Sequence, residues 1–335
     1  MSRYAEAHMS PAGPSDARPT ALQIIKDEAV EGKLTGKVIV ITGTSSGIGI
    51  ETARALSLTG AKLLLTARDL NKARKALDGL LEPGRIELVE MDNTSLASVR
   101  SAAASILEKS NNQVNILINN AGIMALPKLE HTKDGFEMQL GVNHLAHFLL
   151  FQLLKPALLA SASPRFSSRV VNLSSSAHHV AGIREPGDYN FEKGEYNDWV
   201  SYGQSKTANI YMANEIERRY GSRGLHATSV HPGAIGTPLM QYLDASLLEF
   251  MAKDETMGKI MKSPEQGAAT TVWAAIGKEW ENKGGEYLAD CWKTERGNDK
   301  HEIAGEGYAG HAYDAEKEAR LWRDSCQMVG VKDDQ

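Results

Sequence analysis

Tyr202 and Lys206 are the two residues of this sequence whose types and spacing best suit joint proton transfer. They are four positions apart, so on a helix they share one face. A phenol is a weak acid with a reference pKa of about 10, and a nearby cation lowers that pKa by favouring the phenolate. The pair could therefore act as a general acid and base. Alone, this spacing is common on solvated helix faces, so whether the pair is catalytic depends on the other motifs of the sequence.

A glycine-rich stretch near the N-terminus has the makeup of a phosphate-binding turn. Glycines permit a tight turn and let backbone N–H groups approach a pyrophosphate, and the N-terminus of a following helix adds a favourable dipole. The stretch has the spacing GxxxGxG, which departs from the GxGxxG fingerprint, but it follows a buried strand and opens a helix as that fingerprint requires. The residues predicted to bind are Gly43, Ser45, Ser46, Gly47, Ile48 and Gly49.

Alternating strands and helices must position these residues. Apolar runs rich in β-branched residues predict strands at 38–41, 63–65, 86–89, 115–118, 170–173, 225–230 and 286–288. Helical periodicity predicts helices at 20–32, 48–58, 70–81, 96–109, 135–155, 202–220 and 264–277. Parallel strands need crossover helices, so we expect an α/β fold with a doubly wound sheet of seven parallel strands, a Rossmann fold, in a single domain.

The two ends of the chain lie outside this alternation. Residues 1–19 are rich in Pro, Ser and Ala, and we expect them to be disordered and dispensable for folding and cofactor binding. The domain is expected to span 20–335, with a core at about 37–290 and a C-terminal extension at 291–335. A predicted amphipathic helix at 314–328 either closes the pocket or meets a partner subunit, which leaves a homo-oligomer open.

Composition excludes several classes of protein. The 335 residues are 42% apolar and 24% charged, as in ordinary soluble globular proteins. A net charge of −5 gives no indication of a nucleic-acid partner, and no apolar run is long enough to predict a membrane span. Cys291 and Cys326 lie far apart without a CxxC motif, so we expect neither a disulfide framework nor a metal site. With no targeting segment evident, the expected location is cytoplasmic.

The residue that ends the second strand of such a fold meets the adenosine ribose, where an acid selects NAD and an arginine accommodates the 2′-phosphate of NADP. Arg68 has that position, and its planar guanidinium suits a phosphate. Asp69 could face the ribose instead, or cap the next helix. The sequence therefore favours NADP(H). Asp92, at the end of the third strand, precedes Asn93-Thr94-Ser95 and a predicted helix, so it could cap that helix.

Further motifs agree in order with the first two. Thr42-Gly43 to Gly49 gives TGxxxGxG, and Tyr202 to Lys206 gives YxxxK. Between and after them come Asn119-Asn120-Ala121-Gly122, Asn143, Ser175 and His231-Pro232-Gly233. Over about residues 37–290 the sequence resembles the short-chain dehydrogenase/reductase family. The strings around Asn143, Ala177-His178-His179 and His231-Pro232-Gly233 resemble its retinol-dehydrogenase-like branch, which includes fungal tailoring reductases.

This resemblance implies roles for the candidate residues. Tyr202 would be the general acid in reduction and the base in oxidation, and Lys206 would lower the pKa of the phenol and hold the nicotinamide ribose. Ser175 would hydrogen-bond the substrate oxygen. Asn143 would hold a water for proton relay, unless it is only a buried helix amide. Asp92 would contact the adenine, unless it only caps a helix, and the cofactor would also meet Asn120, Pro232, Gly233, Ile235 and Thr237.

We therefore expect an NADP(H)-dependent oxidoreductase that interconverts a ketone or aldehyde and an alcohol on an apolar small molecule, such as a retinoid, steroid or polyketide. Residues 234–262, rich in Leu and Met, form either an adaptable pocket wall or a helix packed on the core. His178 and His179 are expected to be loop residues near the pocket. Two alternatives stay open: a cofactor-binding regulator without turnover, and a tailoring enzyme whose net reaction is not redox.

Overall fold

A single eight-stranded sheet organises the chain in this computed structural model, which describes residues 2–184, 187–297, 303 and 305–333. The strands are β1 (Val38–Thr42), β2 (Lys62–Ala67), β3 (Ile86–Glu90), β4 (Ile116–Asn119), β5 (Ser168–Leu173), β6 (Leu225–His231), β7 (Tyr287–Ala289) and β8 (Trp292–Lys293). Their order is β3-β2-β1-β4-β5-β6-β7-β8, and all neighbours are parallel except β7 and β8. The doubly wound Rossmann fold is confirmed.

The strand β8 corrects the predicted count of seven. It is antiparallel to β7 and follows a two-residue turn at Asp290 and Cys291, whose φ values of 53° and 52° are both positive. Positive φ at both central residues is typical of a type I′ hairpin turn. Neither residue is a glycine or an asparagine, so the sequence carries no strong turn signal at this point.

The helices alternate with the strands along the chain. They are α1 (Ala5–Met9), α2 (Ala21–Asp27), α3 (Ile48–Ser57), α4 (Leu70–Ala76), α5 (Leu96–Lys109), α6 (Met138–Leu140), the π-helix η1 (Gly141–Leu145), α7 (Ala146–Ser161), α8 (Asp198–Tyr220), α9 (Ala245–Lys253), α10 (Glu255–Ile260), α11 (Pro264–Gly267), α12 (Ala269–Ile276) and α13 (Ala315–Val329). Short 3₁₀ turns are η2 (Ser176–His179), η3 (Gly221–Arg223), η4 (Pro238–Tyr242), η5 (Lys278–Trp280) and η6 (Gly310–Ala312).

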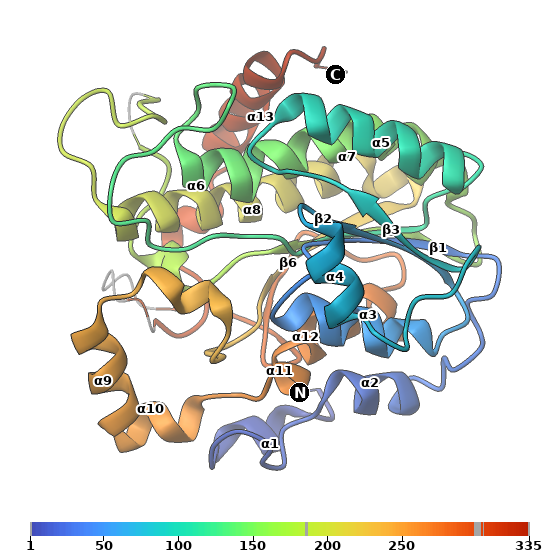
Figure 1. Cartoon of the computed structure of the whole chain (residues 1–335), viewed down its shortest axis with the longest axis horizontal. Coiled ribbons are helices and arrows are strands. Elements are labelled where there is room, and N and C mark those ends of the chain that lie inside the picture. Colours follow the sequence, from blue (N-terminus) through green and yellow to red (C-terminus); the bar gives the residue numbers. More distant parts are fainter. Residues whose placement is uncertain (1, 185–186, 298–302, 304, 334–335) are drawn as a thin grey trace.

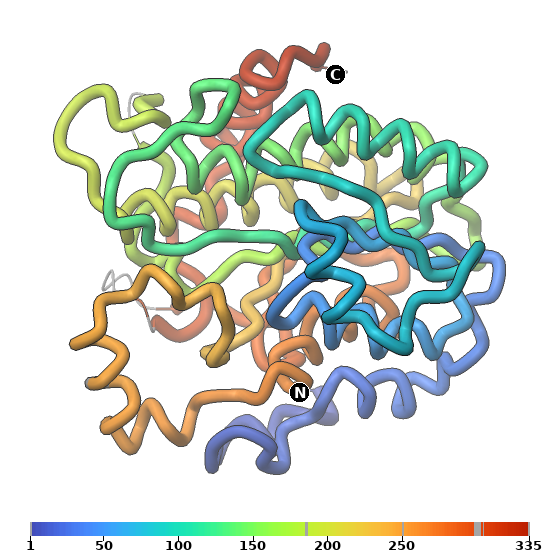
Figure 2. The backbone as a smooth tube through the Cα atoms, in the orientation of Figure 1, coloured from blue at the N-terminus to red at the C-terminus, as the bar shows by residue number. Residues whose placement is uncertain are grey.

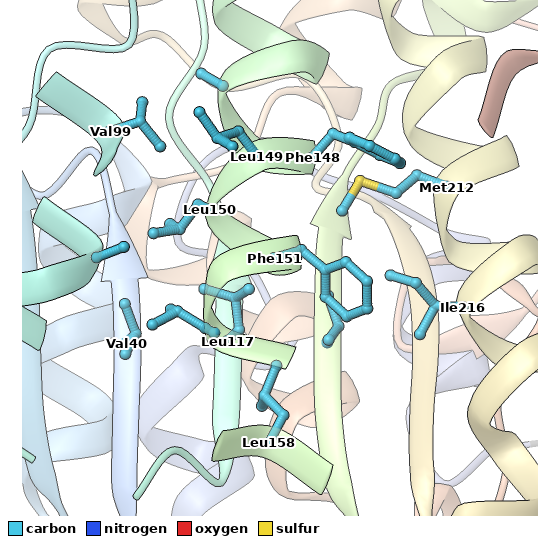
Figure 3. Packing of buried hydrophobic residues seen from close by; sticks show 14 of the residues in the cluster. Val40, Val99, Leu117, Phe148, Leu149, Leu150, Phe151, Leu158, Met212 and Ile216 are labelled. Carbon is cyan, nitrogen blue, oxygen red and sulfur yellow. The ribbon is translucent and has the colours of Figure 1, made fainter. Parts of the chain in front are cut away.

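Two helical layers cover the sheet. In Figure 1, α5, α7, α8 and α13 lie on one face, and α2, α3 and α12 lie on the other. Each layer has its own hydrophobic cluster. Figure 3 shows the first cluster, in which Leu150 of α7 points towards Val40 of β1 and Leu117 of β4, while Phe151 points towards Ile216 of α8. Because both faces are buried, the central strands are continuous apolar runs.

The helix predicted at 135–155 is interrupted by a short π-helix that contains the candidate residue Asn143. Residues Gly141–Leu145 form a π-turn between α6 and α7, and Asn143 lies inside it. Single π-turns within α-helices are rare and often occur at functional sites. Gly141 packs so tightly against the methyl group of Thr132 that a Cβ atom would overlap it. The apolar periodicity of the sequence continues through the turn, so the sequence pattern does not predict it.

The prediction that residues 1–19 are disordered is wrong for the part that the structure describes. Tyr4 and Arg18 are buried, and Figure 2 shows the N-terminal tube running beside the segment of α10 and α11. The Arg18 guanidinium donates to the carbonyl oxygens of Ile260 at 2.8 Å and Met261 at 2.6 Å, and to Asp16 at 2.9 Å. The N-terminal segment is ordered because the buried Arg18 guanidinium binds backbone carbonyls. A prediction from apolar composition does not include hydrogen bonds of this kind.

Residues 234–262 do not pack on the core as a helix, which was one of the two alternatives. They form η4, α9 and α10. In Figure 1, α9 and α10 extend away from the sheet and its two helical layers, and no residue of α10 is buried. The predicted C-terminal helix is α13, which packs on α8 and on the π-turn. Across the described residues, no helix has the length and apolar character needed to cross a membrane.

Candidate functional site

The carboxyl ends of the parallel strands bring the predicted residues to one edge of the sheet. The glycine turn follows β1, Arg68 follows β2, Asp92 follows β3, Asn120 follows β4, Ser175 follows β5 and Pro232 follows β6. The π-turn adds Asn143, and α8 adds Tyr202 and Lys206. This edge is where ligands bind in doubly wound folds.

Each glycine of the turn is required by its surroundings. Gly43 has a φ of 73°, and a Cβ atom on it would lie 2.7 Å from the Cα atom of Ala121. Gly47 has a φ of 62° and faces the side chain of Thr237 across the edge. A Cβ atom on Gly49 would overlap the carbonyl oxygen of Gly43. The turn is therefore a cradle of bare backbone at the N-terminus of α3, which suits a pyrophosphate.

Thr42 and His147 connect this cradle to the rest of the site. The Thr42 hydroxyl oxygen accepts from the backbone N–H groups of Asn120 and Ala121, both at 2.9 Å, so its own proton is available to Nε2 of His147 at 2.9 Å. Nδ1 of His147 lies 2.9 Å from the Asn143 carbonyl oxygen. Burial lowers the pKa of His147 to about 4. A neutral imidazole thus joins the strand end to the π-turn.

Asn120 stabilises the glycine turn through its Nδ2, whereas its Oδ1 has no partner among the described residues. Its Nδ2 donates to the carbonyl oxygens of Thr42 at 2.8 Å and Gly43 at 3.2 Å. Its Oδ1 is buried, and within the described residues it has no hydrogen-bond donor. Buried acceptors normally have a partner. The bare backbone and this acceptor fit a polar ligand that lies along the edge, as a dinucleotide would.

Asn143 is fully buried and holds the backbone opposite it. Its Oδ1 accepts from the N–H group of Ile123 at 2.9 Å, and its Nδ2 donates to the Ile123 carbonyl at 3.0 Å and to the Ser205 hydroxyl at 2.9 Å. A Cβ atom on Gly122 would lie 3.3 Å from Oδ1 of Asn143 and 3.5 Å from Nζ of Lys206. Asn143 and Lys206 are therefore neighbours, and the relay role of Asn143 stays a prediction.

Two serines, Ser174 and Ser175, follow β5, and their hydroxyl groups have different surroundings. The Ser174 hydroxyl is buried and donates to the Lys206 carbonyl at 2.8 Å, which fixes it to the backbone of α8. Ser175 is half-buried, its hydroxyl oxygen accepts from the Ala177 N–H at 3.1 Å, and its side chain is close enough to Tyr202 to lower the pKa of that phenol. Of the two serines, only Ser175 is next to the phenol.

Tyr202 and Lys206 lie one turn apart on α8, with Nζ of Lys206 over the Tyr202 ring at 5.4 Å from its centroid. Both are buried. Burial raises the pKa of Tyr202 to about 12, and the hydrogen bond with Ser175 lowers it in part. Burial also lowers the pKa of Lys206 to about 8. The family resemblance implies that Lys206 lowers the pKa of the phenol, but burial is the larger effect, so the phenol keeps its proton at neutral pH.

Arg68 and Asp69 have separate surroundings. Asp69 is the N-cap of α4, and its carboxylate accepts from the N–H groups of Asn71 and Lys72, both at 2.9 Å. These bonds lower the pKa of Asp69. Arg68 is exposed, and in the described part of the chain its guanidinium has no hydrogen-bond or ion-pair partner. The cap alternative for Asp69 is confirmed, which leaves Arg68 beside the expected ribose position.

Asp92 is engaged within its own loop. Its carboxylate accepts from the N–H and hydroxyl groups of Thr94 at 3.0 and 2.8 Å, and pairs with Lys133 at 2.8 Å. Burial raises the pKa of Asp92, but Lys133 and Thr94 together hold it below its ordinary value. The cap of α5 is Ser95, so Asp92 is not the cap of that helix. Its proposed contact with an adenine stays a prediction.

The loop after β6 is held by a lysine that the sequence did not single out. Nζ of Lys262 is buried, donates to the Pro232 carbonyl at 3.2 Å and pairs with Asp290 at 2.6 Å. Gly233 has a φ of 103°, and a Cβ atom on it would lie 2.9 Å from this lysine side chain. Ile235 forms a bridge with Lys262. The contacts of Lys262, like the contact between His147 and Thr42, join residues far apart in the sequence, so no local motif predicts them.

The comparisons with known proteins agree with this geometry. The family model described as "short chain dehydrogenase" matches residues 37–247. Short-chain dehydrogenase/reductase prx1 of Penicillium roqueforti is 50% identical, with 99% of this chain and 96% of that protein covered. Oxidoreductase calI of Penicillium decumbens is 40% identical, with 99% of both covered, and human Retinol dehydrogenase 13 is 37% identical, with 89% and 86% covered.

Solved structures resemble the chain in the same way. The crystal structure of an uncharacterised protein from Mycobacterium Paratuberculosis has a TM-score of 0.68 and 30% identity, covering 95% of this chain and all of that chain. The Pseudomonas aeruginosa RhlG/NADP active-site complex has a TM-score of 0.60 and 25% identity, covering 76% and 95%. The chain therefore belongs to the short-chain dehydrogenase/reductase family, in the branch that contains the retinol dehydrogenases and related fungal reductases.

Proposed function

We propose that this protein is an NADP(H)-dependent oxidoreductase that interconverts a ketone or aldehyde and an alcohol on an apolar small molecule. One observation carries the proposal: the buried Tyr202 phenol lies beside Ser175, whose side chain lowers its pKa, and one helical turn from Lys206, at the same sheet edge as the glycine cradle. A proton donor and a dinucleotide cradle at one edge are the two requirements for carbonyl reduction.

The proposed preference for NADP(H) over NAD(H) depends on the residues that follow β2. NADP(H) would supply the hydride or accept it. The cradle of Gly43, Gly47 and Gly49 would hold the pyrophosphate, and Arg68 would pair with the 2′-phosphate. Asp69 caps α4 through Oδ1 alone, so the choice between NADP and NAD depends on the exposed Arg68 guanidinium, which suits a 2′-phosphate. The similar RhlG structure is an NADP active-site complex, which supports the same choice.

The chain's own residues would divide the remaining chemistry. In reduction, Tyr202 donates its phenolic proton to the carbonyl oxygen of the substrate, and in oxidation its phenolate takes that proton back. The Ser175 hydroxyl donates a hydrogen bond to the same oxygen and stabilises the charge that develops there. Lys206, buried beside the phenol, stabilises the phenolate when the proton leaves and holds the nicotinamide ribose.

The apolar substrate class is proposed from the segment after β6. In α9 and α10, Leu247, Met251 and Met257 are only half-buried, so this segment has apolar side chains that a ligand could cover. Flexible Leu and Met side chains suit an adaptable pocket wall. The relatives named retinol dehydrogenases point to substrates of this character, and we include steroid- and polyketide-like ketones among the candidates.

Single-turnover oxidation of NADPH, followed by its absorbance across a panel of apolar ketones and aldehydes, tests the proposal. We expect at least one carbonyl compound to be reduced, and Tyr202→Phe to abolish most of that rate. If tight NADPH binding is found but no member of a broad panel is reduced, the cofactor-binding regulator is favoured. If a compound is consumed while NADPH is unchanged, the reaction is not redox.

A further inference from the structure

We propose that His178 is a positioning residue that ties the catalytic Ser175 to the C-terminal extension through a single imidazole ring. This inference rests on the proposed function, because it assumes that the Ser175 hydroxyl acts on the substrate oxygen. Nδ1 of His178 lies 2.6 Å from the Ser175 carbonyl oxygen, and Nε2 accepts from the Ala309 N–H at 3.0 Å. Ala309 lies well beyond residue 247, where the match to the family model ends.

The two contacts require one protonation state of the ring. A carbonyl oxygen can only accept, so Nδ1 must carry the proton, and a backbone N–H can only donate, so Nε2 must be bare. Only the neutral Nδ1–H tautomer satisfies both. Burial lowers the pKa of His178 to about 3, and His179, His311 and His231 disfavour its charged form further. The neutral form therefore persists across the physiological range.

Ser175 is held unusually firmly by this ring. Its carbonyl accepts from His178 twice, from the backbone N–H at 3.1 Å and from the imidazole at 2.6 Å. Ser175 is also the N-cap of η2, so its hydroxyl oxygen faces the Ala177 N–H. Fixing the carbonyl fixes the peptide plane, and the plane sets where the hydroxyl points relative to Tyr202.

The ring itself is locked by its neighbours. His178 is completely buried, with the ring of Tyr287 4.8 Å away and that of His179 4.4 Å away between centroids. Nε2 of His311, from the C-terminal extension, lies 2.8 Å from the His178 carbonyl oxygen. The extension therefore meets the serine loop through both the side chain and the backbone of His178.

Substitutions at His178 and at Ala309 each remove the hydrogen bond between the His178 ring and the C-terminal extension. His178→Phe removes both hydrogen bonds, whereas His178→Asn keeps a donor that can reach the Ser175 carbonyl. Ala309→Pro removes the N–H of the extension and puts the proline Cδ in its place against Nε2 of His178, so the contact is broken and the ring is displaced. The φ of −70° at Ala309 is one that proline adopts. Ala309→Gly is the matched control, because it changes the same residue but keeps the N–H.

We expect His178→Phe and Ala309→Pro to lower kcat for ketone reduction roughly 10- to 100-fold, the scale of a misplaced catalytic group. The NADPH dissociation constant and the KM of the ketone should change little, His178→Asn should restore part of the rate, and Ala309→Gly should keep it. In a Ser175→Ala background, His178→Phe should cost nothing further, because both act through one hydroxyl. Losses that multiply in the double variant would overturn the positioning role.

Hydrogen exchange of peptides covering 174–180 gives a readout that does not need turnover. Ala309→Pro should speed exchange there relative to Ala309→Gly, and this comparison still decides if His178→Phe does not fold. If the wild type reduces no carbonyl compound, the proposed function fails. Unchanged exchange in the proline variant would overturn the tie itself, whatever the enzyme does.

Discussion

Nζ of Lys206 lies over the ring of Tyr202, 5.4 Å from its centroid, and both side chains are buried on α8. The ammonium group donates to the Leu173 carbonyl at 3.1 Å, at the end of β5. Lys206 thus joins α8, which carries Tyr202, to the end of β5, two residues before Ser175. A change at Lys206 should therefore affect the phenol and the architecture of the edge together.

Tyr202→Phe should slow single-turnover reduction by about 100-fold or more, because it removes the proton donor and leaves the packing of the ring. NADPH binding should persist, since the glycine cradle is unchanged. Lys206→Ala should lower the rate and also weaken NADPH. The double variant should be little worse than the poorer single one, because the two residues act as a unit.

Tyr220→Phe is the matched control for this prediction. Tyr220 is also buried on α8, but it lies at the far end of the helix next to Lys155. It should keep the wild-type rate. If Tyr202→Phe keeps more than about a tenth of the wild-type rate, outside the range of general acid catalysis, another group donates the proton.

Arg68→Ala should change cofactor choice. A charge-assisted contact with the 2′-phosphate contributes about 1.5–3 kcal/mol, which corresponds to a roughly 10- to 150-fold weaker NADPH dissociation constant. NADH binding should be nearly unchanged. Titration of both nucleotides by fluorescence measures this. Arg54→Ala, an exposed arginine on α3 paired with Glu51, is the control. Equal losses for both nucleotides, or a wild-type preference for NADH, would refute the role of Arg68.

The sequence predicts the parts of this fold that depend on local pattern. The helix at 96–109 has its predicted bounds, and the glycine turn, Tyr202 and Ser175 lie at the predicted edge. The features that the sequence pattern does not predict depend on contacts between residues that are distant in the sequence. The π-turn around Asn143 keeps the apolar periodicity of a helix, and the Arg18 and His178 contacts join segments more than one hundred residues apart.

Arg18→Ala should lower the free energy of unfolding by about 2–4 kcal/mol, because it takes the guanidinium donor away from the part-buried carbonyls of Ile260 and Met261. The same contacts predict that deleting residues 1–19 destabilises the protein, contrary to the expectation from composition. Urea unfolding measures both. Arg3→Ala, which removes a half-exposed ion pair with Glu28, should cost at most about 1 kcal/mol. A deletion variant as stable as the full chain would show that the N-terminal contacts are dispensable.

Lys206→Met should make the protein more stable at neutral pH. Burial lowers the pKa of Lys206 to about 8, against 10.5 for the free side chain, so below pH 8 the fold carries a buried charge that costs about 3 kcal/mol. Methionine removes this cost but loses the hydrogen bond to Leu173, worth about 1 kcal/mol. Asn209 still donates to that carbonyl at 2.8 Å. The expected gain at pH 7 is therefore about 2 kcal/mol.

The sign of the pH dependence tests the cause. Between pH 8 and 10.5 the folded wild type loses the Lys206 proton before the unfolded chain does, so its stability rises with pH relative to the methionine variant. The advantage of Lys206→Met should shrink steadily over that window, in urea unfolding at pH 7, 8 and 9.5. Lys253→Met, at an exposed position on α9, should differ from wild type by less than about 1 kcal/mol at each pH. A gain from Lys206→Met that does not change with pH would mean that the extra stability comes from packing and not from removal of a buried charge.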